Sequence, residues 1–227
     1  MREVFGSWGG CYDRKQRKRP FALLYFLLTK GACGMKKVAI LLFEDVELLD
    51  FAGPYEVFSS VRGADGTPLM KVLSVAESAE LVRCRNGLVV QPGYTLENCP
   101  VVDIVLLPGG RGTVTAVNRP HLINWIIARS QQTELMTSVC TGSFLLAKAG
   151  LLAGKQATTY FGSIPTMRES YPDIEVLEAV RWVDAGNVIT SAGVSAGIDM
   201  ALHLVARLFG KPVADATARG IEYDYWA

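Results

Sequence analysis

Thr137-Ser-Val-Cys-Thr-Gly142 is the stretch on which the predicted fold depends. A β-type run, Glu134 to Val139, stops at Cys140, and after two further residues a helix-type run, Ser143 to Ala149, begins. A strand, a sharp turn and a helix within so few residues indicate a nucleophile elbow, in which the turn holds the reactive side chain clear of the main chain.

The residues around Cys140 are small enough for such a turn. Ser138 lies two residues before the cysteine and Gly142 two residues after it, so both leave room for a strained backbone. The sulfur would lie at the N-terminus of the following helix, where the helix dipole favours the thiolate and predicts a pKa below ~8.5. A thiolate is the nucleophilic form. A small buried cysteine filling the space between a strand and a helix fits the same pattern, and this stretch alone does not decide between the two interpretations.

The composition predicts one globular α/β domain. The chain has 227 residues, of which 50% are hydrophobic, and this is enough for a sizeable core. Its net charge of +1 argues against a general nucleic-acid binder or a strongly basic membrane-surface protein. Five cysteines without C-x-x-C spacing and two histidines predict no disulfide framework and no zinc site, so a reducing, cytoplasmic compartment is expected. The cysteines are Cys11, Cys33, Cys84, Cys99 and Cys140.

Residues 1–34 differ from the rest of the chain in charge. They hold seven Lys or Arg and two Asp or Glu, a net charge of +5, whereas residues 35–227 carry a net charge of −4. A basic cluster precedes the apolar run Phe21 to Leu28, an order that resembles a signal peptide. Eight apolar residues are too few to span a bilayer as a helix. We predict that residues 1–34 are an extension, disordered or upstream of a natural start at Met35, and that residues 35–227 form the domain.

From Met35 onward the pattern alternates between strands and helices. Continuous apolar runs are typical of parallel strands that are buried on both faces. Asn86-Gly87 joins two short runs as in a hairpin, and Pro54 suits the first turn of a helix. The expected strands cover 38–43, 69–75, 80–84, 88–91, 101–107, 134–139, 156–159, 175–177, 180–183 and 188–190. The expected helices cover 120–129, 143–149, 163–170 and 194–209, with one entered through 50–58 and another beginning near 212. Repeated units of this kind predict a doubly wound α/β fold with a mostly parallel sheet and helices on both faces.

Ligands of such folds bind outside the carboxyl ends of the strands, and this rule brings three loops together. The first contains Asp50, the second contains Gly109 and Gly110, and the third contains Cys140 and Thr141. The N–H groups of the glycines and of Thr141 could form an oxyanion-type pocket. A phosphate cradle is a second interpretation, although G-x-x-x-x-G-K-[ST] and G-x-G-x-x-G are both absent, and plain turn chemistry is a third.

These stretches, taken together, resemble the ThiJ/PfpI (class I glutamine amidotransferase-like) superfamily and, within it, most of all the isonitrile hydratase group. The resemblance runs through nearly all of residues 35–227, and the order and spacing of the motifs make it specific. The matching motifs are Leu41-Leu-Phe43, Leu49-Asp-Phe-Ala-Gly-Pro-Tyr-Glu-Val57, Leu107-Pro-Gly-Gly110, Ser138-Val-Cys-Thr-Gly-Ser143, Gly150-Leu-Leu-Ala-Gly-Lys-Gln-Ala-Thr-Thr159 and Ala196-Gly-Ile-Asp199.

The resemblance implies a flavodoxin-like sandwich, a homodimer, and no metal or organic cofactor. It also implies that Cys140 is the nucleophile, that Asp50 is the acidic partner of its sulfur, and that Thr141 is a neighbouring active-site side chain. A carboxyl group beside a thiol can hold a proton and pass it on, and the two groups would titrate together. Asp50 could instead only cap a helix that starts near Pro54.

The reaction implied by the resemblance is hydration of an isonitrile, R–N≡C, to an N-substituted formamide. Cys140 would attack the terminal carbon, Asp50 would supply a proton, and water would release the thioimidate. Proteases of the superfamily carry a histidine directly after the nucleophile, and here Thr141 stands in its place, so a Cys-His protease is not expected. Tyr160-Phe161 replaces the His-Trp pair typical of the isonitrile hydratases, which keeps aromatic bulk beside the expected substrate and removes an imidazole.

Other functions stay open at this point. The same kind of domain forms the sensory half of AraC-type regulators, which continue into a helix-turn-helix region for which this chain, ending at Ala227, leaves no room. Glyoxalase or deglycase activity on reactive carbonyls, and a redox-sensing cysteine, are further alternatives. Cys99, His121 and His203 are interpreted as structural or surface residues. A small-molecule substrate is expected, with neither nucleic acid nor membrane as partner.

Overall fold

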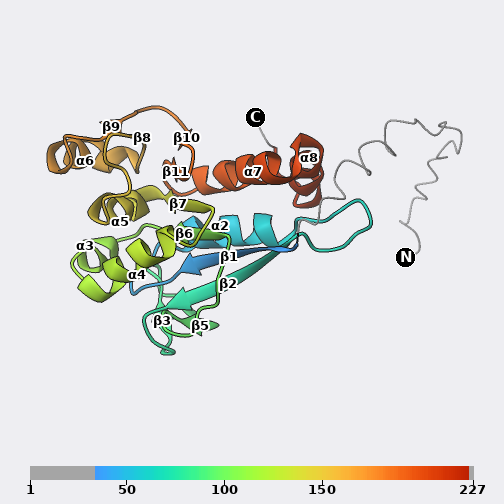
Figure 1. The fold of residues 1–227 in the computed structure, drawn as a ribbon, viewed down its shortest axis with the longest axis horizontal. Coiled ribbons are helices and arrows are strands. Elements are labelled where there is room, and N and C mark those ends of the chain that lie inside the picture. Colours follow the sequence, from blue (N-terminus) through green and yellow to red (C-terminus); the bar gives the residue numbers. More distant parts are fainter. Residues whose placement is uncertain (1–33, 225–227) are drawn as a thin grey trace, which may run out of the picture. The chain divides into compact units, whose positions relative to one another are not determined.

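A seven-stranded sheet forms the centre of the protein (Figure 1). The computed structural model describes residues 34–224, so the predictions for residues 1–33 lie outside the described part of the chain. The strands of this sheet are β1 (Lys36–Leu41), β2 (Met70–Ala76), β5 (Tyr94–Thr95), β6 (Ile104–Leu107), β7 (Leu135–Val139), β10 (Trp182–Asp184) and β11 (Val188–Ser191).

The strand order is β10-β11-β7-β6-β1-β2-β5, and every neighbouring pair is parallel except β10 with β11. The chain therefore winds outward from β1 in both directions, to β2 on one side and to β6 and β7 on the other. Strand β6 and residues 38–41 of β1 are apolar and buried, and β7 is buried throughout although it includes Thr137 and Ser138, as expected of inner strands covered on both faces. The predicted doubly wound α/β fold is confirmed.

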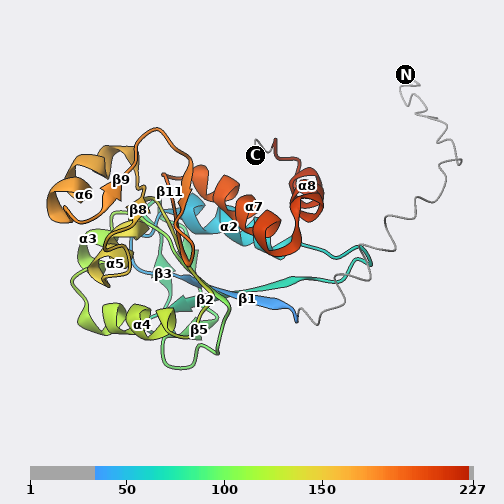
Figure 2. The ribbon, with the colours of Figure 1, turned by 45° about the horizontal axis from the view of Figure 1, so that its top comes forward.

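Helices cover both faces of the sheet (Figure 2). On one face α2 packs against α7, which in turn packs against α8, and on the other face α4 packs with α5. The helices are α2 (Leu48–Ser59), α3 (Thr113–Ala116), α4 (Pro120–Ser130), α5 (Ser143–Lys148), α6 (Ile164–Ser170), α7 (Ala196–Phe209) and α8 (Lys211–Gly220), with 3-10 turns η1 (Cys140–Gly142) and η2 (Phe161–Ser163). Within residues 34–224, no helix has both the length and the apolar character needed to cross a membrane.

The start of α2 differs from the prediction. The helix begins at Leu48, so Asp50 lies in its first turn rather than in a loop, and Pro54 lies inside the helix rather than in its first turn. Asp50 is therefore not the N-cap residue; Glu47 has that place, with no side-chain capping bond. The proline leaves the Asp50 carbonyl without the N–H that residue i+4 normally donates.

Two short sheets lie outside the central one. The predicted hairpin exists as β3 (Val82–Arg83) and β4 (Val89–Val90), which are antiparallel and shorter than expected. The predicted strands near 156–159 and 175–177 pair with each other as β8 (Gln156–Ala157) and β9 (Glu175–Val176) and do not join the central sheet.

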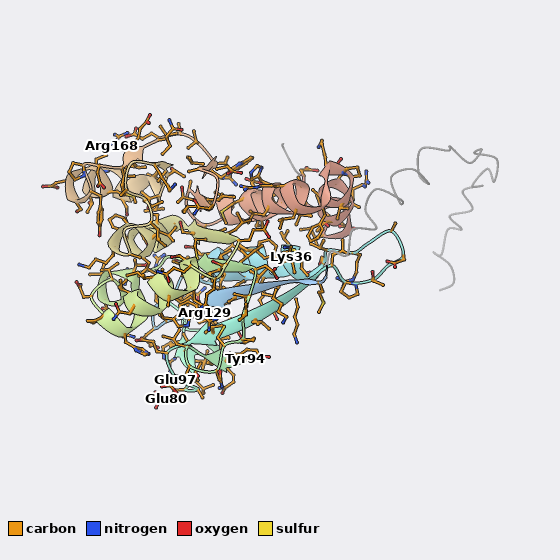
Figure 3. All side chains as sticks on the ribbon, viewed as in Figure 1. Lys36, Glu80, Tyr94, Glu97, Arg129 and Arg168 are labelled. Carbon is orange, nitrogen blue, oxygen red and sulfur yellow. The ribbon has the colours of Figure 1, made fainter. Side chains whose placement is uncertain are left out.

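Two arginines that are labelled in Figure 3 tie helices to neighbouring segments. Arg129 of α4 donates to the carbonyl of Cys99 (2.6 Å) and to that of Pro100 (3.1 Å). Arg168 of α6 donates to the carbonyl of Val176 in β9 (2.8 Å). These bonds hold the outer helices in place, while the loops that follow β1, β6, β7 and β11 meet at one edge of the sheet and form the site.

Candidate active site

The elbow predicted at Cys140 is present. The strand β7 ends at Val139, Cys140 opens the 3-10 turn η1, and its φ of +57° is a left-handed value that is rare for a residue other than glycine. A Cβ atom at Gly142 would lie 1.9 Å from the carbonyl oxygen of Leu107, so only glycine fits two residues after the cysteine. The structure therefore contains the strained backbone at Cys140 and the need for a small residue at position 142 that the sequence predicted.

Hydrogen bonds fix the backbone of Cys140 on both sides. Its N–H donates to the carbonyl of Ala192 (3.2 Å). Its own carbonyl accepts from the hydroxyls of Thr159 (3.0 Å) and Ser143 (3.1 Å). Only 7% of the residue is exposed to solvent, so the direction and the surroundings of the sulfur are set by the fold.

The carboxyl group of Asp50 lies beside this thiol. Its Oδ2 accepts from the N–H of Gly109 (2.9 Å) and its Oδ1 from the N–H of Val194 (3.1 Å). Asp50 and Cys140 are also hydrogen-bonded to each other through their side chains. The acid is fully buried. Gly109, Cys140 and Val194, from three separate parts of the chain, therefore contact one carboxyl group. The structure brings together Asp50 and Cys140, which the sequence analysis paired.

Burial controls the protonation of both groups. It raises the pKa of the Asp50 carboxyl group to about 7, to which the negative charge of Glu47 adds, while the N–H of Gly109 and the Cys140 thiol oppose it. Burial, followed by the charge of Asp50, raises the pKa of the Cys140 thiol to about 12, against the N–H of Thr141. The prediction of a lowered thiol pKa is therefore wrong, because the loss of solvent and a neighbouring carboxylate outweigh the helix N-terminus.

The N–H groups of both glycines after β6 are hydrogen-bonded within the protein. The N–H of Gly109 is bonded to Asp50, and the N–H of Gly110 donates to Oγ1 of Thr141 (3.0 Å). A Cβ atom at Gly109 would lie 2.5 Å from that same oxygen. An oxyanion pocket made from these two N–H groups is therefore not present in this conformation, because internal acceptors already occupy both donors.

Thr141 is held by the same loop. Its hydroxyl shares a hydrogen bond with Oγ1 of Thr113 (3.0 Å) in addition to the bond from Gly110. A hydrogen bond from Thr141 to the sulfur of Cys140 lowers the pKa of the thiol, although less than burial raises it. Thr141 thus contacts Cys140, and its hydroxyl is oriented by Thr113, which sequence reasoning missed.

Tyr160 and Phe161 have different surroundings: Tyr160 lies near Cys140, whereas Phe161 borders a cavity. Their rings contact each other, with centroids 4.5 Å apart. A Cβ atom on Gly193 would lie 2.6 Å from the Tyr160 ring and 3.6 Å from the sulfur of Cys140, so Tyr160 lies close to the thiol. Phe161 is 77% exposed and borders a cavity of about 510 Å³ instead. Of the aromatic pair, only Tyr160 is part of the immediate surroundings of Cys140.

The cavity adjoins the turn that contains Cys140. Its walls include Thr159 and Ala192, two of the residues that hydrogen-bond to the backbone of Cys140. The remaining walls are mainly apolar and come from the segments around α6 and before β10. In the described part of the chain, no three His, Cys, Asp or Glu side chains gather in a way that could hold a metal ion.

Sequence reasoning missed two further contributors. Glu47 ends the loop after β1, three residues before Asp50, and its Oε2 pairs with Nη1 of Arg85 (2.5 Å) from the hairpin. The sequence places Glu47 only three residues before Asp50, and this nearness could have indicated an electrostatic effect on the acid. Val194 is 144 residues away from Asp50, so the sequence gave no indication of its contact.

A scan against protein-family models matches residues 36–207 to the DJ-1/PfpI family. The chain belongs to this family. Isonitrile hydratase from Pseudomonas putida is 37% identical over 82% of this chain and 78% of its own length. The HTH-type transcriptional regulator GbdR from Pseudomonas aeruginosa is 29% identical over 83% of this chain, which spans 51% of that regulator.

The solved structures agree with this assignment. A ThiJ/PfpI family protein from Pseudomonas syringae matches with a TM-score of 0.76 and 31% identity, over 86% of this chain and 77% of that one. The predicted superfamily and its flavodoxin-like fold are therefore confirmed. Since the relatives include both a hydratase and a regulator, membership does not fix the reaction.

Proposed function

We propose that this protein is an isonitrile hydratase-like enzyme in which Cys140 is the nucleophile and Asp50 moves the proton. The observation that carries the proposal is the pair itself: a buried carboxyl group with a pKa of about 7, hydrogen-bonded to a thiol on a strained elbow. The 37% identity to isonitrile hydratase supports this choice of substrate class.

The first step joins the sulfur to the terminal carbon of R–N≡C. Because the thiol has a raised pKa, it is protonated at rest and must lose its proton as it attacks. The Asp50 carboxylate takes the proton from sulfur and delivers it to the same carbon, which gives the thioimidate R–N=CH–S–Cys140. One proton moves from sulfur to carbon through the acid, so the step is balanced without a further reactant.

The second step consumes water. Water adds to the thioimidate carbon, the nitrogen gains a proton, and the C–S bond breaks, which yields R–NH–CHO and the free thiol. Asp50 carries one proton of the water to the nitrogen, and then carries the second, from the hydroxyl of the tetrahedral intermediate, to the departing sulfur. Covalent capture in this way divides one difficult hydration into two easier steps.

The cavity beside the elbow supports an apolar R group. It has about 510 Å³, and Phe161, Ile164 and Val180 give it mainly apolar walls. A space of this size suits an aryl or branched alkyl group. Glu178 adds a carboxylate to the lining. The proposal therefore favours isonitriles with such groups over isonitriles that carry a negative charge.

A substrate panel tests the proposed function. Aryl and alkyl isonitriles, methylglyoxal and a casein peptide mixture are each incubated with the protein, and formamide is followed by its formyl proton in NMR spectra. We expect formamide from the isonitriles, background rates for Cys140→Ala, and near wild-type rates for Cys99→Ala, which removes another buried cysteine. No formamide from any isonitrile, or full activity of Cys140→Ala, would overturn the proposal; consumption of methylglyoxal alone would favour the glyoxalase alternative.

A ligand-sensing domain is the second candidate. The 29% identity to a transcriptional regulator over 83% of this chain favours it. In that case a small molecule would bind in the same cavity without being converted. Calorimetric binding of an isonitrile to wild-type protein, with no formamide formed over hours, is the result that would support sensing over catalysis.

A further inference from the structure

The loop of residues 192–195 touches both members of the proposed pair. The carbonyl of Ala192 accepts from the N–H of Cys140 (3.2 Å), and the N–H of Val194 donates to Asp50 (3.1 Å). Val194 has a φ of +55°, which a β-branched residue adopts only under constraint from its surroundings. The position of this N–H therefore depends on whatever holds the loop.

Arg181 holds the loop at both ends. Its carbonyl accepts from the N–H of Ala192 (2.9 Å) at the first end. Its guanidinium group contacts Oγ of Ser195 at the second end, at 3.4 Å from Nη1 and 3.3 Å from Nη2. One residue thus spans the segment that carries the Val194 N–H.

Asp199 orients this guanidinium. Its Oδ2 accepts from Nε of Arg181 (2.5 Å), and its Oδ1 accepts from the hydroxyl of Tyr223 (2.8 Å). The Asp199 side chain is 8% exposed, whereas that of Arg181 is 48% exposed. A planar guanidinium fixed by a buried carboxylate has one orientation, which a flexible exposed pair would not.

We propose that Arg181 and Asp199 are positioning residues, which hold loop 192–195 so that the N–H of Val194 stays on the carboxyl group of Asp50. The inference rests on the proposed function only in assigning Asp50 as the group that transfers the proton. A hydrogen bond to a carboxylate favours its ionised form, so weakening the loop would raise the pKa of Asp50. The rate of any step that needs the ionised acid would then rise at a higher pH.

The other groups that face Asp50 come from different elements. Glu47 precedes it on the loop after β1 and pairs with Arg85 of the hairpin, and the thiol of Cys140 faces it from the elbow. The N–H of Gly109 occupies its second oxygen. None of these bonds to Arg181 or Asp199, so changes in the positioning pair leave them in place.

The matched control is a second ion pair that joins the β10 region to α7. Arg207 of α7 binds Asp184 of β10 (2.8 Å) and the carbonyl of Gly186 (2.8 Å), with no hydrogen bond to loop 192–195. Arg181→Met and Arg207→Met each remove one guanidinium between the β10 region and α7. Ser195→Ala is a milder third variant that removes only the contact at the end of the loop.

The experiment measures two pH profiles for each folded variant. One is kcat/KM for an aryl isonitrile, and the other is the rate at which iodoacetamide alkylates Cys140, read by peptide mass. We expect the acid limb of both profiles to move up by about one pH unit in Arg181→Met, which is a tenfold change in proton affinity. Ser195→Ala should move it less in the same direction, and Arg207→Met should leave it at the wild-type position.

Wild-type profiles in both Ser195→Ala and any folded Arg181 variant would overturn the positioning role, and so would an equal shift in Arg207→Met. If Arg181→Met fails to fold, Ser195→Ala and Arg181→Lys, which keeps the charge but loses the planar fork, decide the question. The alkylation profile does not need turnover. A wild-type protein that is inert toward isonitriles therefore refutes the proposed function while the positioning role is still measured.

Discussion

Asp50 and Asp199 occupy similar places in two helices that pack against each other. Each lies in the first turn of its helix, α2 or α7, and both are buried. Their partners differ. Asp199 binds the guanidinium of Arg181 and the hydroxyl of Tyr223, whereas Asp50 binds two backbone N–H groups and a thiol.

Asp199 thus has a cationic partner, whereas Asp50, the acid of the proposed mechanism, has uncharged ones. A guanidinium compensates the charge of a buried carboxylate, whereas N–H dipoles do so only in part. The pKa of Asp50 therefore rises to about 7, chiefly through burial, and its proton is exchangeable near neutral pH. A buried acid without a cationic partner, next to a thiol, is the more useful group for proton transfer.

The largest expected effect comes from neutralising each acid in turn. Asp50→Asn removes the proton carrier, so isonitrile turnover at pH 9 should fall by roughly 10²-fold or more. Asp199→Asn leaves Asp50 in place, and at this pH, above the acid limb, turnover should fall by less than about tenfold. Steady-state rates on both variants, with folding checked by circular dichroism, test the comparison. Wild-type turnover in Asp50→Asn would end the assignment of Asp50 as the acid.

Stability against pH gives the next largest effect. The folded pKa of Asp50 is about 7, above the ordinary value of 3.8, so between pH 4 and 7 the native state keeps a proton that the unfolded chain has lost. The free energy of unfolding should therefore fall as pH rises through this window, by about 2 to 4 kcal/mol. Urea unfolding at pH 4.5 and at pH 8 measures it. Asp50→Asn lacks this component, so an equal pH dependence in wild type and variant would contradict the raised pKa.

The smallest effect concerns the charges around Asp50. The negative charge of Glu47 adds to the raised pKa of Asp50, so Glu47→Gln should move the acid limb of the pH–rate profile down by about half a unit. Arg85→Gln leaves Glu47 without its partner and should move the limb in the opposite direction. Shifts of opposite sign in the two variants support the electrostatic account. Shifts of the same sign would mean that the hairpin acts through structure instead.

The sequence by itself determined the features that depend on near neighbours. Continuous apolar runs predicted the inner strands, because a strand buried on both faces needs no polar residue. A strand, a cysteine and a glycine in close succession predicted the elbow, since the turn is made within the residues that carry the pattern. The order of the motifs was enough for the family, and pairing Asp50 with Cys140 followed from it.

Only the tertiary structure decided how these groups behave. The Asp50 carboxyl group bonds to Gly109, which is 59 residues away, and to Val194, which is 144 residues away. Such partners can be assigned only when the sheet has brought the loops together. This is why the sequence did not reveal the hydrogen bonds of the glycine N–H groups or the proposed role of Arg181. The thiol pKa rises rather than falls for the same reason: desolvation and a neighbouring carboxylate arise from the closed fold, whereas the favourable helix N-terminus is local.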